Sequence, residues 1–124
     1  MINVTLWLDK SGCLFGIDAS GHSGSAAKGK DIICSAASAL LRTVSRTLEI
    51  EPSIKLVGGI EEQGELHLRL TLIEESKRGW LGGVSSFTVL GLKDLAAEYP
   101  SFCRVQLVTG DPDIKDNKES NYGT

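Results

Sequence analysis

The stretch INVTLWLDKSGCLFGIDAS, from Ile2 to Ser20, contains two runs of alternating apolar and polar residues on either side of a short turn. Such alternation predicts strands with one buried face and one exposed face. The turn at residues 10–12 is short enough to join antiparallel neighbours, so we predict a hairpin over residues 2–9 and 13–20. A chain that opens in this way is expected to build a largely antiparallel sheet.

The rest of the chain predicts two helices and three further strands. Apolar residues recur at helical spacing over residues 31–49 and 80–99, and Pro52 and Pro100 lie just beyond the two ends. The remaining predicted strands cover residues 54–60, 65–73 and 102–109. The resulting order, ββαββαβ, predicts an α+β fold in which two helices pack on a largely antiparallel five-stranded sheet.

Alternation also predicts which strand residues share a face. In the first hairpin, Phe15, Ile17 and Ala19 are expected to lie on one side of the sheet, with the polar residues on the other. In the second hairpin the residues expected to face one way are Leu66, Leu68, Leu70 and Leu72. His67, between two of these leucines, is predicted to be an exposed sheet residue.

Length, composition and charge describe one domain and exclude several kinds of partner. The 124 residues are 41% hydrophobic and 23% charged, which is typical of a globular protein. We predict a single domain over residues 1–110 and a polar, disordered tail over residues 111–124. A net charge of −3 without a long basic cluster gives no basis for direct nucleic-acid binding.

The three cysteines predict reduced thiols and a cytoplasmic location. They are odd in number and far apart, at positions 13, 34 and 103, which does not suit a disulfide framework. No cluster of Cys and His has the spacing of a zinc site, so we predict no metal and no cofactor. The N-terminus lacks a signal-peptide pattern and no apolar run reaches the length of a membrane helix, so we predict no membrane association.

The loop GHSGSAAKGKDIIC, from Gly21 to Cys34, admits two kinds of chemistry. Residues 24–30 spell G-x-x-x-x-G-K, the start of a phosphate-binding loop. Such a loop requires Ser or Thr after the Lys, whereas Asp31 stands there. A carboxylate at a helix start repels phosphate, and the opening hairpin is foreign to the parallel core of phosphate-loop enzymes. The sequence therefore disfavours this interpretation.

The second kind of chemistry is that of an activated thiol. If Asp31 caps the predicted helix, Cys34 lies in its first turn, where backbone N–H groups and the helix dipole stabilise a thiolate. The loop can bring His22 close enough to take the thiol proton and later to protonate a leaving amine. Asp31 is a candidate for orienting this imidazole, and Ser38 lies one turn beyond Cys34.

Each of these residues also has a purely structural interpretation, which the residues alone leave open. Cys34 can be a small buried hydrophobe, Asp31 a helix cap, and Ser38 a small residue that permits close packing. The thiols of Cys13 and Cys103 are predicted to lie in the core or on a sheet face. Trp7 and Trp80 are predicted to be packing or interface residues.

The residues of this loop and helix carry a family resemblance. Gly21-His22, the G-x-D-[IV]-[IV]-C pattern of residues 29–34 and the Ala-Ala-Ser-Ala-Leu of residues 36–40 resemble the signature of the ribosomal-processing cysteine proteases called Prp. The order ββαββαβ also matches the fold of that family. Ser35 departs from the family pattern, which usually has Ala after the cysteine.

The resemblance implies a function and a set of site residues. It implies a cytoplasmic, homodimeric cysteine endopeptidase that removes a short N-terminal extension from a large-subunit ribosomal protein. Cys34 would be the nucleophile and His22 its base, with Asp31 and Ser38 in supporting roles. The residues of the implied substrate-ordering loop include Gly21, Ser23, Gly24 and Gly29. The alternatives are a non-catalytic ribosome-assembly or ribosomal-protein-binding module with the same fold, and a thiol hydrolase of other specificity.

Overall fold

The computed structural model describes residues 1–21, 28–61 and 65–112, without the side chains of residues 28–31 and 34. The described strands and helices follow one another in the predicted order ββαββαβ. Their bounds are β1 (Ile2–Leu8), β2 (Leu14–Ser20), α1 (Lys28–Glu49), β3 (Ile54–Ile60), β4 (Leu66–Ile73), η2 (Glu75–Lys77), α2 (Arg78–Glu98) and β5 (Cys103–Thr109). The tail predicted after residue 110 lies mostly outside these residues and stays a prediction.

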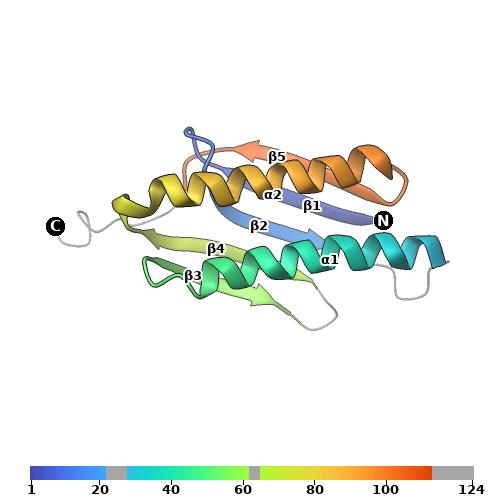
Figure 1. Ribbon diagram of the computed structural model, residues 1–124, viewed down its shortest axis with the longest axis horizontal. Coiled ribbons are helices and arrows are strands. Elements are labelled where there is room, and N and C mark those ends of the chain that lie inside the picture. The colour runs from blue at the N-terminus through green and yellow to red at the C-terminus, as the bar shows by residue number, and fades with distance from the viewer. Residues whose placement is uncertain (22–27, 62–64, 113–124) are drawn as a thin grey trace.

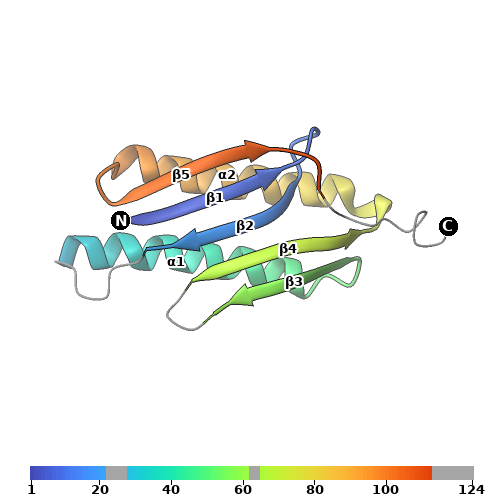
Figure 2. The same ribbon diagram turned by 180° about the vertical axis from the view of Figure 1, so that it is seen from behind.

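The five strands form one sheet in the order β3-β4-β2-β1-β5. All neighbouring pairs are antiparallel except β1 and β5, which run parallel and are separated in the chain by three strands and both helices. Both helices cover the same face of this sheet, as the front and back views show (Figures 1 and 2). The predicted α+β fold is confirmed, and the layer arrangement, which the sequence left open, is one of two helices on one face.

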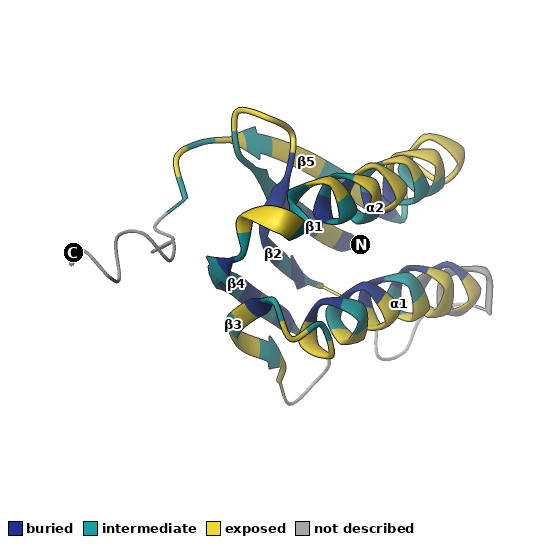
Figure 3. Cartoon of the chain, turned by 60° about the vertical axis from the view of Figure 1, so that its left-hand side comes forward, coloured by how far each residue is buried: buried dark blue, intermediate teal, exposed yellow. Residues whose placement is uncertain are grey.

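The covered face carries the hydrophobic core. Figure 3 shows that the buried sides of α1 and α2 turn toward the sheet and that their exposed sides turn away from it. Strand residues that point toward the helices alternate with residues that do not, as the pattern Val4, Leu6 and then Leu66, Leu68, Leu70 illustrates. Because burial of a large aliphatic side chain stabilises a fold by about 1.5–3 kcal/mol, this face provides the principal stabilisation.

Two irregularities in strand pairing make two of the predicted face assignments wrong. Pairing on the β1–β2 side passes from Trp7↔Gly16 to Leu8↔Leu14, which leaves Phe15 as an extra residue on the face without helices, beside Trp7. Pairing on the β3–β4 side also shifts, so Leu72 is only half-buried and Ile73 occupies the buried position instead. A β-bulge inserts one residue and so reverses the alternation that follows it.

The first turn is fixed by one aspartate. Asp9 Oδ1 accepts hydrogen bonds from the backbone N–H groups of Ser11 and Cys13, each at 2.9 Å. Its other oxygen accepts a bond of 2.9 Å from Arg78, at the start of α2. Gly12, with φ of 89°, supplies the left-handed backbone that closes the turn. The hairpin and the second helix are thereby joined at one end of the sheet.

Candidate functional site

The end of β2 directs the chain toward the loop that carries the predicted base. Gly21 follows the last residue of the strand and has φ of 87°, a conformation that only glycine adopts without strain. A side chain at this position would also collide with the main-chain oxygen of Met1. Glycine at position 21 is therefore required by the backbone conformation and by the close approach of Met1.

Helix α1 begins at Lys28, three residues before the predicted start. The prediction that Asp31 is the N-cap and that Cys34 lies in the first turn is therefore wrong. Asp31 lies inside α1, and Cys34 lies in the second turn, where backbone N–H groups are bonded within the helix. Because the effect of the helix dipole falls off within the first turn, the dipole supports a thiolate at Cys34 less than the sequence suggested.

The structure describes the predicted site residues to different extents. Three of them, His22, Ser23 and Gly24, lie outside the described residues, so their roles stay predictions. Gly29 lies in the first turn of α1 and not in the preceding loop. Ser38 is half-buried and lies one turn after Cys34 on the same helix.

The other two cysteines occupy the positions predicted for them. Cys13 is 5% exposed and Cys103 is 1% exposed, so both are core residues. The half-buried Trp80 packs against the core, as predicted for a packing residue. The only thiol with a predicted chemical role is therefore the one at position 34.

On the face without helices, Asp18 is the centre of a polar network that the sequence analysis missed. Its carboxylate accepts hydrogen bonds from Trp7 Nε1 at 2.8 Å and from His67 Nδ1 at 2.9 Å. Arg69 donates two more, of 3.1 and 2.7 Å, one to each oxygen. Burial raises the pKa of Asp18, but the hydrogen bonds from these three side chains outweigh burial and lower it to about 2.

His67 connects this network to the hairpin between β3 and β4. Its Nδ1 contacts Asp18, and its Nε2 lies 3.3 Å from Oε1 of Glu65. The pKa of His67 is raised, first by the hydrogen bond to Asp18 and then by Glu65. His67 lies on the sheet as predicted, but it is half-buried rather than exposed, with 42% of its side chain accessible, and it has two hydrogen-bond partners.

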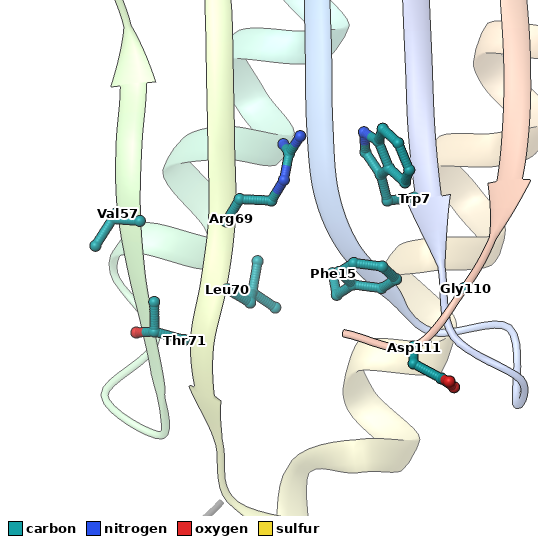
Figure 4. A pocket seen from close by; sticks show the side chains of 8 residues that line it. All are labelled: Trp7, Phe15, Val57, Arg69, Leu70, Thr71, Gly110 and Asp111. Atoms are coloured by element: carbon teal, nitrogen blue, oxygen red, sulfur yellow. The ribbon is translucent and has the colours of Figure 1, made fainter. Parts of the chain in front are cut away.

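A shallow pocket of about 420 Å³ lies beside this network. Figure 4 shows Arg69 extending from β4 toward β2 and the ring of Trp7, with Phe15 below them in this view. The guanidinium carbon lies 5.2 Å from the centre of the Trp7 ring, a cation–π distance. Gly16 makes this reach possible, because a Cβ there would approach Arg69 Cδ to 2.8 Å.

Sequence reasoning missed this network because its members come from different strands. Asp18 pairs with His67, and Gly16 with Arg69, across β2 and β4, two strands separated by a helix and a further strand. In the sequence, the members of this network appear only as polar residues that alternate with apolar ones within each of two strands. Such alternation does not determine which strands pair.

Among the described residues, neither helix is long and apolar enough to cross a membrane.

Comparison with protein families finds one match. The sequence model of the family described as cysteine protease Prp matches residues 1–104, which include both Cys34 and His22. A search of curated proteins gives no match.

Comparison with solved structures finds the same fold in proteins of Streptococcus mutans and Staphylococcus aureus. A protein of Streptococcus mutans called SMU.848 is 27% identical, with a TM-score of 0.72, over 89% of this chain and 96% of that one. The essential ribosomal processing protease Prp from Staphylococcus aureus, in complex with a substrate peptide, is 20% identical, with a TM-score of 0.71, over 86% and 99% of the two chains. The same protease with a covalently linked product peptide gives a TM-score of 0.69 at 20% identity.

Proposed function

The chain belongs to the family of Prp cysteine proteases, and from this premise we propose that it is an endopeptidase that trims a ribosomal protein. The substrate is a large-subunit ribosomal protein with a short N-terminal extension. Cys34 is the nucleophile and His22 its base. The observation that carries the proposal is that the family match spans both residues and the fold that holds them.

A related protein supports a covalent mechanism. The Staphylococcus aureus protease has been seen with a substrate peptide and with a covalently linked product peptide. A covalent product is what nucleophilic catalysis leaves on an enzyme when the second half-reaction has not occurred. The matching fold of the present chain makes the same type of chemistry reasonable at Cys34.

The proposed reaction has two steps. His22 takes the proton of the Cys34 thiol, and the sulfur attacks the carbonyl carbon of the scissile peptide bond. The imidazolium of His22 then gives its proton to the leaving amine, and a thioester remains on Cys34. Water, deprotonated by His22, attacks the thioester and returns the thiol and a free carboxylate.

Because α1 starts at Lys28, activation of the Cys34 thiol depends on His22 more than on the helix dipole. Cys34 lies in the second turn, where the helix dipole gives little stabilisation to a thiolate. A neighbouring imidazolium stabilises the thiolate directly. In this proposal Asp31, three residues before Cys34 on the same helix, orients the imidazole, and Ser38, one turn after Cys34, has a supporting role.

Cleavage of an extended ribosomal protein, followed by mass spectrometry, tests this function. The full chain is expected to release the N-terminal extension, and Cys34→Ala is expected to abolish release while retaining peptide binding. Ser35→Ala is the matched control, because Ser35 is the exposed neighbour of Cys34 on α1; it should cleave like the unmodified chain. Peptide binding without cleavage by the unmodified chain would favour a binding module, and cleavage of other acyl substrates alone would favour a different thiol hydrolase.

A homodimeric state and a cytoplasmic location belong to the same proposal, since both rest on the family resemblance. Sedimentation equilibrium over a range of protein concentrations tests the first, and a mass of one chain at all concentrations would contradict it.

A further inference from the structure

The sheet face without helices is called the open face here. The polar network around Asp18 on this face ends in three side chains whose ligand atoms lie close together. Glu61 follows the last residue of β3, Glu65 directly precedes β4, and His67 is the second residue of β4. One carboxylate oxygen of each glutamate and a ring nitrogen of His67 all lie within 4.8 Å of one another. We propose that Glu61, Glu65 and His67 bind a divalent metal ion of the zinc class.

The distance between two of these ligand atoms fits a bound ion. His67 Nε2 and Glu65 Oε1 are 3.3 Å apart. Two ligands about 2.0 Å from a tetrahedral zinc ion are themselves about 3.3 Å apart. Glu61 is exposed, so its side chain can move the remaining distance without losing packing.

The hydrogen bond on the far side of the imidazole selects the tautomer that a metal requires. Asp18 accepts from Nδ1 at 2.9 Å, so in the neutral ring the proton is at Nδ1 and a lone pair is at Nε2. That lone pair is directed at a carboxylate oxygen of Glu65, and two acceptors face each other only when a proton or a cation lies between them. A carboxylate–histidine pair of this kind is the usual support of a metal-binding imidazole.

Asp18 is itself held in place. Trp7 and Arg69 both donate to its carboxylate, at 2.8 Å and at 3.1 and 2.7 Å. The orientation of the His67 ring is therefore set before an ion arrives, which reduces the entropy that binding has to offset.

The charges of the cluster also match a divalent ion. Arg69 neutralises Asp18 through the bidentate pair, which leaves Glu61 and Glu65 with two negative charges. Among the described residues, the one ion pair made by these glutamates is that of Glu65 with His67, and Arg69 is paired with Asp18. An ion of charge +2 balances this excess.

The ion would join the two arms of the β3–β4 hairpin at the end of the sheet where β2 ends. The N–H of Glu61 donates to the carbonyl of Glu65 at 2.7 Å, so the two glutamates face each other across the hairpin. On its other edge, β4 pairs with β2, where Leu66 is opposite Ala19. Ala19 is two residues before Gly21. Metal binding is therefore expected to stiffen the part of the sheet from which the loop to His22 departs.

Calorimetric titration of the metal-stripped, untagged full chain with zinc chloride tests the proposal. Cys34→Ala is the background, because it removes the proposed nucleophile as a competing thiol ligand for zinc and separates this result from that of the protease assay. One ion is expected to bind per chain with a dissociation constant of about 10 μM or tighter. His67→Gln and Glu65→Gln should each weaken binding at least about tenfold, and Asp18→Asn by about 10- to 100-fold.

Two further measurements keep the result clear. Glu75→Gln, at a side chain that is 91% exposed and outside the cluster, is the control and should bind zinc like the background. Nitrogen NMR of the imidazole should show Nε2 of His67 deprotonated in the presence of zinc. Absence of binding at about 100 μM zinc, equal affinity in His67→Gln, or a ring that stays protonated at both nitrogens in excess zinc would overturn the proposal.

Discussion

The covered face of the sheet is stabilised by burial of apolar side chains, whereas the open face is stabilised by ion pairs and hydrogen bonds. Toward the helices, side chains such as Leu6 and Leu68 are almost completely buried. Each contributes to the free energy of unfolding through the apolar volume that it buries. On the opposite face, Asp18, His67 and Arg69 interact through hydrogen bonds of defined direction. The first kind of surface tolerates exchange of one apolar residue for another of similar size, while the second depends on particular partners in a particular register.

The largest expected effect is on the covered face. Leu6 is 0% exposed, so Leu6→Ala removes buried volume and leaves a cavity, and should lower the free energy of unfolding by about 2–5 kcal/mol. Val57→Ala on the open face, where Val57 is 57% exposed, should cost less than about 0.5 kcal/mol. Urea unfolding measures both changes. Similar losses in the free energy of unfolding in the two variants would show that the two faces do not differ in this way.

A smaller effect is expected at Ser85, one of two buried polar residues of α2 among the described residues. Ser85 Oγ accepts a bond of 2.8 Å from the backbone N–H of Leu14 and donates one of 2.7 Å to the carbonyl of Leu81. Ser85→Ala leaves the buried N–H of Leu14 without its acceptor and should cost about 1–3 kcal/mol. The same change at Ser86, its exposed neighbour on α2, is the control. A loss no greater than that of Ser86→Ala would show that this bond does not stabilise the fold.

The smallest of the three effects is expected on the open face, and it depends on pH. Because the pKa of Asp18 is about 2 in the folded chain and about 3.9 in an unfolded one, its ionised form stabilises the fold at pH 5 and above. That stabilisation is lost as the pH falls from about 4 to about 2. Asp18→Asn should therefore cost about 1–2 kcal/mol at neutral pH.

The comparison between pH 7 and pH 2.5 isolates this contribution. In metal-free protein, Asp18→Asn should reduce the difference in the free energy of unfolding between the two pH values. Asp94→Asn, at an exposed position of α2, should leave that difference unchanged. Identical pH dependence in Asp18→Asn and the original chain would mean that the open-face network adds nothing to stability.

The two faces also differ in how far the sequence predicts them. Alternation identified the five strands, and apolar spacing identified both helices, because burial against a neighbouring layer imposes a period on the residues themselves. The assignments of Phe15 and Leu72 failed where a β-bulge shifted the pairing, since one extra residue reverses the alternation. The partners of Asp18 were not predictable, because pairing between β2 and β4 is a property of the assembled sheet.

The candidate site was predicted more from the family motif than from arguments about helix capping and the helix dipole. The family resemblance drawn from the loop and the start of α1 is confirmed by the match over residues 1–104. The helix start was misplaced because Asp31 has a strong preference for caps and Gly29 is a weak helix former, yet a glycine within a helix costs only about 1 kcal/mol. Continuation of the helix to Lys28 outweighs that cost through additional helical hydrogen bonds.

The activation of Cys34 by His22 is tested most directly by the rate of alkylation of native thiols between pH 6 and pH 8. The burial of Cys13 and Cys103 makes them internal references that should not react until the chain unfolds. Cys34 should react several-fold faster at pH 6.5 than the same cysteine in the unfolded chain, and His22→Ala should abolish the difference. A Cys34 that reacts no faster in the folded chain than in the unfolded one, with or without His22, would contradict the account.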